Sequence, residues 1–168
     1  MKKMIAAVLA AMLALGGLAC AETLVGIPNP WVDTTADGLT EALGLRFGVP
    51  EGAENVVYRM LESDSLAEMT FTWEGMDYCA RIKPAAEFED ISGLYYEWEN
   101  VQEDFTVGSC AAWEARARDG ETTVDLCLWY DAAPGLMYSI CTSADNDLDG
   151  FDLLAAAEQV YLPVQGDA

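Results

Sequence analysis

Residues 66–83 have the sequence LAEMTFTWEGMDYCARIK, and this stretch decides the fold. Apolar and polar side chains alternate on both sides of its central glycine. The apolar set on one face is Met69, Phe71, Trp73, Tyr78, Ala80 and Ile82. A period of two around a glycine-containing turn is typical of a β-hairpin. We expect a two-residue turn with Gly75 first, which would place Trp73 opposite Tyr78.

The same alternation extends along most of the chain. Further strands are expected at residues 56–60, 94–98, 110–118, 122–130 and 136–142, with Asp119 and Gly120 as a second hairpin turn. Residues 35–44 and 149–161 have helical patterns. Thr34 or Thr35 is the expected cap of the first helix and Gly44 its end. The sequence therefore predicts an α+β fold, in which about seven antiparallel strands form a curved sheet. Both helices would cover one face and leave the other wet.

The first 21 residues, MKKMIAAVLAAMLALGGLACA, have the layout of a secretory signal. Lys2 and Lys3 precede an apolar run that is shorter than the ~20 residues of a membrane span. Cleavage after Ala21 would leave residues 22–168 as a single domain, secreted outside the cytoplasm. Lipid attachment at Cys20 is the alternative and would anchor the protein at the cell surface.

The charge and composition narrow the function. The chain has 29 acidic and 8 basic residues and a net charge of −21. Such a surface repels nucleic acid and anionic membranes. There is no histidine, which removes the commonest general base, the usual zinc ligand and any Ser-His or Cys-His pair. We therefore expect no catalytic residues and no cofactor.

Four cysteines follow the signal: Cys79, Cys110, Cys127 and Cys141. By the alternation, all four are expected on the polar face of the sheet, which in an exported protein favours two disulfides. A three-residue turn at 133–135 would place Cys127 opposite Cys141, and Cys79 would then pair with Cys110. A redox role is the alternative, without support from a C-x-x-C motif.

One acidic segment resembles the start of a calcium loop. Asp145, Asp147 and Asp149 alternate before Gly150, but the twelfth position is Ala156 instead of a bidentate Glu. The interpretation we favour is a polar turn that caps the last helix, which leaves the chain without an expected metal site.

The aromatic residues allow two interpretations. Most fall on the apolar faces and predict either a filled core or an apolar cavity between the sheet and the helices. Tyr95 and Trp129 are expected on the outer face, where they would contact a protein or a glycan, or shield the disulfides.

Several segments resemble a known group of proteins. They are Asn29-Pro30-Trp31, residues 49–55 (VPEGAEN), residues 69–82, residues 90–93 (DISG) with Tyr96, and residues 137–140 (MYSI). The chain is similar to uncharacterised secreted or lipoprotein domains of Gram-positive anaerobes, and to the domain of unknown function at the C-terminus of anti-sigma-factor-like proteins. The resemblance implies a lipoprotein-carrier-like fold, a curved antiparallel sheet over helices. It implies no catalytic residues.

Together these features predict an exported, non-enzymatic domain that binds an extracellular protein, a glycan or an apolar ligand. An exposed patch near Trp129 would favour a binding partner. A carrier or sensor of an apolar small molecule is the alternative and requires a cavity of several hundred Å³. An enzyme is the third hypothesis, and the sequence offers no convergent polar cluster for it.

Overall fold

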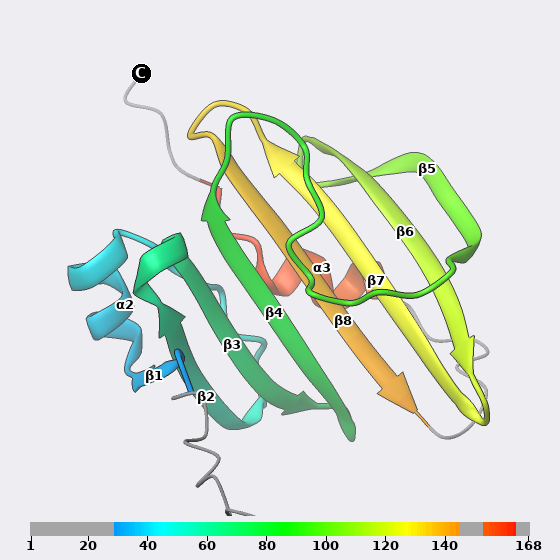
Figure 1. The fold of residues 1–168 in the computed structure, drawn as a ribbon, viewed down its shortest axis with the longest axis horizontal. Helices are drawn as coiled ribbons and strands as arrows, with labels where there is room; N and C mark the ends of the chain where they lie inside the picture. The colour runs from blue at the N-terminus through cyan, green and yellow to red at the C-terminus, as the bar shows by residue number, and fades with distance from the viewer. Residues whose placement is uncertain (1–28, 145–152, 164–168) are drawn as a thin grey trace, which may run out of the picture.

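The computed structural model of the protein describes residues 29–144 and 153–163 (Figure 1). The signal segment, Cys20 and the candidate calcium residues Asp145, Asp147 and Asp149 lie outside the described residues. The elements are β1 (Val32–Thr34), α2 (Ala36–Leu43), β2 (Glu54–Leu61), the short 3-10 helix η1 (Glu62–Asp64), β3 (Leu66–Trp73), β4 (Met76–Pro84), β5 (Glu99–Val107), β6 (Cys110–Asp119), β7 (Thr122–Asp131), β8 (Leu136–Ala144) and α3 (Leu153–Val160).

The strands form one open antiparallel sheet in the order β1-β2-β3-β4-β8-β7-β6-β5. Strands β1 to β4 are consecutive neighbours, and so are β5 to β8 in the reverse direction. The sheet is therefore two four-stranded meanders, and the pairing of β4 with β8 is the seam that joins them (Figure 1).

The first helix begins and ends where the sequence predicts. The Thr35 hydroxyl oxygen accepts a hydrogen bond from the Gly38 amide at 3.1 Å, which caps the N-terminus. Gly44 has a φ of 71°, and its amide donates to the Thr40 carbonyl. This left-handed conformation costs a glycine little and ends the helix.

The main core lies between the sheet and the two helices. Helix α2 contacts β2 and β3, and α3 contacts β5, β7 and β8. Trp129 and Tyr138 stack with ring centroids 5.0 Å apart, and Tyr161 meets both rings edge-on. We call this side of the sheet the helix face. Stacked and edge-on aromatic rings fill its centre.

The opposite side of the sheet, which we call the loop face, is partly covered by residues 85–98. This loop crosses in front of the sheet, on the side away from α3 (Figure 1). A second core lies under it, formed by Leu66, Ile91, Leu126, Leu128 and Met137. The prediction of a wet second face is therefore wrong for this part of the sheet.

The strand number also differs from the prediction, because the sheet has eight strands. Residues 94–98 are not a strand, and β5 begins only at Glu99. The Ser92 hydroxyl accepts a hydrogen bond from the Leu94 amide, and Gly93 has a φ of 68°. Local turn bonds therefore redirect the chain before it can join the sheet. The additional strand is β1, which pairs with β2.

The hairpins at Gly75 and at Gly120 both form, but the register of each differs from the prediction by two residues. Trp73 pairs with Met76 instead of Tyr78, because Glu74 and Gly75 both adopt positive φ and form the two-residue turn themselves. In the second hairpin Asp119 pairs with Thr122, so Trp129 lies opposite Ala112 instead of Cys110. Shifts of two leave every side chain on the same face of its own hairpin.

The turn between β7 and β8 has a larger effect. Asp131 pairs with Leu136, so the loop has four residues and not the expected three. Cys127 consequently lies opposite Ile140, and Cys141 lies opposite Leu126. When the register between two strands shifts by one residue, the side chains of one strand move to the opposite face of the sheet relative to its neighbour. The side chains of β7 therefore lie on the face opposite to the one predicted from β8. β6 follows β7, so Cys110, Cys127 and Trp129 all belong to the helix face.

Candidate functional site

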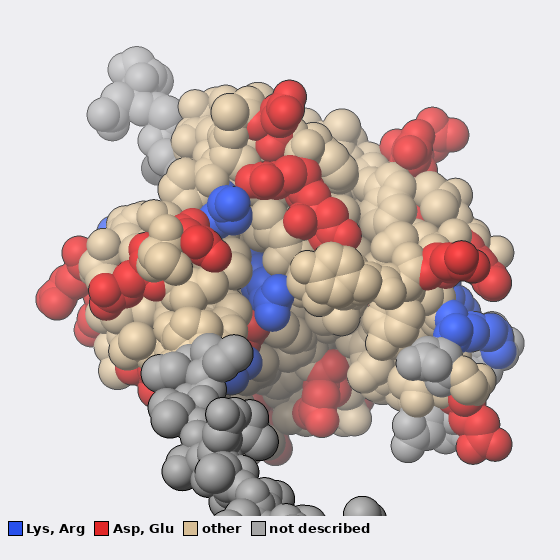
Figure 2. All heavy atoms as spheres, in the orientation of Figure 1, with Lys and Arg blue, Asp and Glu red and all other residues tan. Residues whose placement is uncertain are grey.

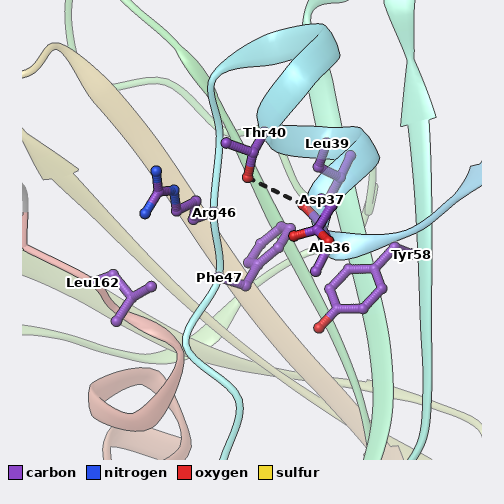
Figure 3. Close-up of a pocket in the computed structure, with 8 residues that line it drawn as sticks. All are labelled: Ala36, Asp37, Leu39, Thr40, Arg46, Phe47, Tyr58 and Leu162. Carbon is purple, nitrogen blue, oxygen red and sulfur yellow. Dashed lines mark hydrogen bonds between the residues drawn. The ribbon is translucent and has the colours of Figure 1, made fainter.

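Two open hollows lie side by side on the helix face, between α2 and the chain that follows α3. The first has a volume of about 320 Å³, and the second about 520 Å³. Arg46 and Leu162 line both, so we treat them as one feature, the Arg46 groove (Figure 3). Both volumes are in the range of small-molecule sites, ~300–1,000 Å³.

The segment after α2 positions Arg46. Leu45 and Phe47 are buried in the main core, and Arg46 between them is exposed. The Gly48 amide donates to the Val160 carbonyl at 2.8 Å, which fastens this segment to the end of α3. A side chain at Gly48 would overlap the carbonyl oxygen of Gln159. The close approach of these two backbones therefore requires glycine.

The walls of the groove are about evenly polar and apolar. The first hollow is lined by Leu39, Phe47, Tyr58 and Leu162, with Ala36, Asp37, Thr40 and Arg46. The second is lined by Leu45, Ile82, Leu136, Tyr138, Leu162 and Pro163, with Gly44 and Arg46. Burial raises the pKa of both tyrosines, Tyr58 and Tyr138.

Arg46 differs in its ion pairing from the other cations that the structure describes. Arg59, Arg81, Lys83 and Arg116 form ion pairs with carboxylates, and Arg118 also has an interaction partner. Arg46 has no ion pair within residues 29–144 and 153–163. Asp37 lines the first hollow as well, on the other side from Arg46 (Figure 3). The groove therefore combines partly apolar walls with one guanidinium group that has no ion pair in the described part of the chain.

A buried ion cluster occupies the loop face. Glu68 is 1% exposed, and its two oxygens accept hydrogen bonds from Nε of Arg59 and of Arg81, each at 2.9 Å. The Trp31 ring lies 5.4 Å from both guanidinium groups. Figure 2 shows basic side chains near the middle of this face, with acidic ones around them. Every charged group of the cluster has a partner, so the cluster leaves no free charged group for a ligand.

The four cysteines do not occupy the expected positions. All four are unbridged thiols, two on each face. Cys127 lies opposite Glu114 and Ile140, so the predicted pair with Cys141 does not form. Cys79 and Cys110 lie on opposite faces, with β8 and β7 between their strands. The structure instead brings Cys79 directly opposite Cys141.

Tyr95 and Trp129, the two aromatic residues predicted to contact a partner, differ in their exposure. Tyr95 is 96% exposed on the loop that covers the loop face. The prediction that Trp129 lies on the surface is wrong, because this side chain is fully buried. Its indole nitrogen has no hydrogen-bond partner among the described atoms. A patch centred on Trp129 is therefore excluded.

Sequence reasoning missed Arg46 and Leu162. Arg46 carried a signal, because it is a cation between two large apolar residues in an acidic chain. Leu162 carried none, since its place in the groove depends on where α3 ends.

Comparison of the chain with protein-family models, with curated proteins and with solved structures gives no match. Among the described residues, neither α2 nor α3 nor the 3-10 turn is long and apolar enough to cross a membrane. Within the same residues no three His, Cys, Asp or Glu side chains converge as a metal site would require.

Proposed function

We propose that the protein is an exported, non-enzymatic binding domain, and that its ligand is a small amphiphile held in the Arg46 groove. The ligand would carry an apolar body and a carboxylate end. One observation carries this proposal: Arg46, which has no ion pair among the described residues, lies where two hollows with partly apolar walls meet, in a chain with a net charge of −21.

The charge balance explains why this observation is informative. With 29 acidic and 8 basic residues, a cation has many carboxylates available to it. An arginine without an ion pair among the described residues therefore keeps its charge and hydrogen-bond donors for an anionic ligand. A carboxylate on a guanidinium group forms a charge-assisted, bidentate hydrogen bond, while the apolar body of the ligand removes the walls from water.

The remaining features support the same class of function. The N-terminal segment supports export to the cell exterior or the cell surface. The absence of histidine supports a binding role over catalysis. The resemblance to secreted and lipoprotein domains favours a carrier-like arrangement, with both helices over one face of a curved sheet. A carrier or sensor of an apolar molecule is thus preferred over a flat protein-binding surface at Trp129.

Isothermal titration with dodecanoate tests the proposal. Wild-type protein should bind dodecanoate, and Arg46→Gln should weaken binding by about 10-fold to 100-fold, the value of a hydrogen bond to a charged group. Arg118→Gln is the matched control, because it removes an exposed arginine from β6 and should leave binding unchanged. Dodecylammonium has the same chain with the opposite charge and should bind far more weakly. Equal binding of dodecanoate by wild type and Arg46→Gln would refute the proposal.

A further inference from the structure

Cys79 on β4 and Cys141 on β8 are direct partners across the seam of the sheet. The pairs on either side, Tyr78 with Thr142 and Ala80 with Ile140, keep the same register, so no bulge displaces the two cysteines. Directly opposite residues in antiparallel strands have Cα atoms about 4.5–5.5 Å apart. A disulfide spans Cα separations of about 4.4–6.8 Å.

We propose that Cys79 and Cys141 form a disulfide that joins the two meanders of the sheet. The bridge would cross the β4–β8 pairing, which is the only strand pairing between the two halves in the described sheet. It would close a long loop of chain, and a cross-link of this kind restricts the unfolded state most. The inference does not depend on the Arg46 groove, which lies on the other face.

Both thiols are accessible to a small oxidant. They are half-buried and line an open hollow of about 310 Å³ on the loop face, beside Leu94 and Tyr96. A hydrogen bond from the Cys79 thiol lowers the pKa of Cys141, and the positive charge of Arg81 acts in the same direction. Cys141 is therefore the thiol that more readily becomes the attacking thiolate.

The bridge forms by exchange with a small external disulfide. The Cys141 thiolate attacks one sulfur of that disulfide, forms a mixed disulfide and releases the first thiolate. Cys79 then loses its proton and attacks the sulfur of Cys141, which releases the second thiolate. Two protein thiols are oxidised, the external disulfide is reduced to two thiols, and the two protons pass to the leaving groups.

The other two cysteines have no such partner. Cys110 and Cys127 both face the main core, and the Cys110 sulfur lies 3.4 Å from the Tyr161 hydroxyl. Their positions are offset by four residues along the paired strands, or roughly 13 Å. Burial raises the pKa of both thiols, which makes them unreactive.

Peptide mapping tests the assignment. Reduced, folded protein is exposed to oxidised glutathione, its free thiols are alkylated, and it is digested without reductant. We expect one linked pair of peptides containing Cys79 and Cys141, with Cys110 and Cys127 alkylated after denaturation. Addition of a reductant should lower the melting temperature of the oxidised protein by about 6–12 °C.

Variants separate the bridge from the packing of each thiol. Cys79→Ser should abolish the linked peptides and the effect of reductant on melting, and Cys127→Ala, the matched control, should retain both. If Cys79→Ser does not fold, the wild-type mapping and its reductant-dependent melting decide the question. A link between any other two cysteines, a link between two molecules, or alkylation of both Cys79 and Cys141 after oxidation would overturn the proposal.

Discussion

Neutralising Glu68 is the sharpest test of the ion cluster on the loop face. In the wild-type protein Arg59 and Arg81 each donate a hydrogen bond to the Glu68 carboxylate. Glu68→Gln keeps the size of this side chain and removes its charge. The amide oxygen can accept from one arginine, but the amide NH₂ then faces the other. One of the two arginines therefore loses its hydrogen-bond acceptor and its opposite charge, beside a residue 68 that is only 1% exposed in the wild-type protein.

The magnitude follows from the burial of the three groups. Breaking a fully buried ion pair costs about 3–5 kcal/mol. The side chains of Arg59 and Arg81 are 36% and 20% exposed, so water recovers part of this loss. We expect Glu68→Gln to lower the free energy of unfolding by about 2–4 kcal/mol, which moves the urea midpoint by about 1–2 M.

The control is Glu89→Gln, which breaks an exposed ion pair with Lys83 at 3.2 Å. Its cost should stay below about 1 kcal/mol and disappear in about 1 M NaCl, whereas the cost at Glu68 should persist. Urea unfolding followed by circular dichroism measures both variants at pH 7. Equal losses for Glu68→Gln and Glu89→Gln would refute the account of the cluster.

Three further outcomes are expected. Trp129→Ala should cost about 3–5 kcal/mol in urea unfolding, whereas Tyr95→Ala should change stability by less than about 0.5 kcal/mol; the reverse order would contradict the assignment of faces. Gly48→Ala should destabilise by about 1–3 kcal/mol and weaken dodecanoate binding, since its methyl group overlaps the Gln159 carbonyl; full stability would show that the two backbones can separate freely. Burial raises the pKa of Tyr78 from 10.0 to about 12. Because the unfolded chain loses the Tyr78 proton at a lower pH than the folded protein does, the free energy of unfolding should fall above pH ~10. Urea midpoints measured from pH ~8 to ~11 should show a shallower fall for Tyr78→Phe.

Much of the local structure was predictable from short patterns. The Thr35 cap and Gly44 end of α2, and the turns at Gly75 and Gly120, follow from residues that satisfy the backbone locally. The alternation in residues 66–83 correctly placed Tyr78 and Ala80 on one face and Cys79 on the other.

The relation between neighbouring strands was not predictable in the same way. β7 is buried from Thr123 through Trp129, so its hydrophobic pattern does not distinguish one face from the other. The face was then decided by one residue in the loop before Leu136. That single difference moved Trp129 into the core and separated Cys127 from Cys141.

The alternation at residues 94–98 shows another limit of the pattern. Leu94 and Tyr96 line the hollow on the loop face, and Trp98 packs edge-on against Trp113. Apolar side chains on an extended loop over a sheet have the same period as those of a strand. Only the turn bonds at Ser92 and the conformation of Gly93 reveal the difference.

The Arg46 groove is proposed to bind an anionic amphiphile. Nuclear magnetic resonance of isotope-labelled protein during a titration with dodecanoate tests it most directly. We predict that the Arg46 side-chain Nε–H and the Leu162 methyl signals shift together and saturate, while the signals of Tyr96 and Leu94 on the loop face stay fixed. Shifts centred on the loop face, or none in the groove at saturating dodecanoate, would contradict the claim.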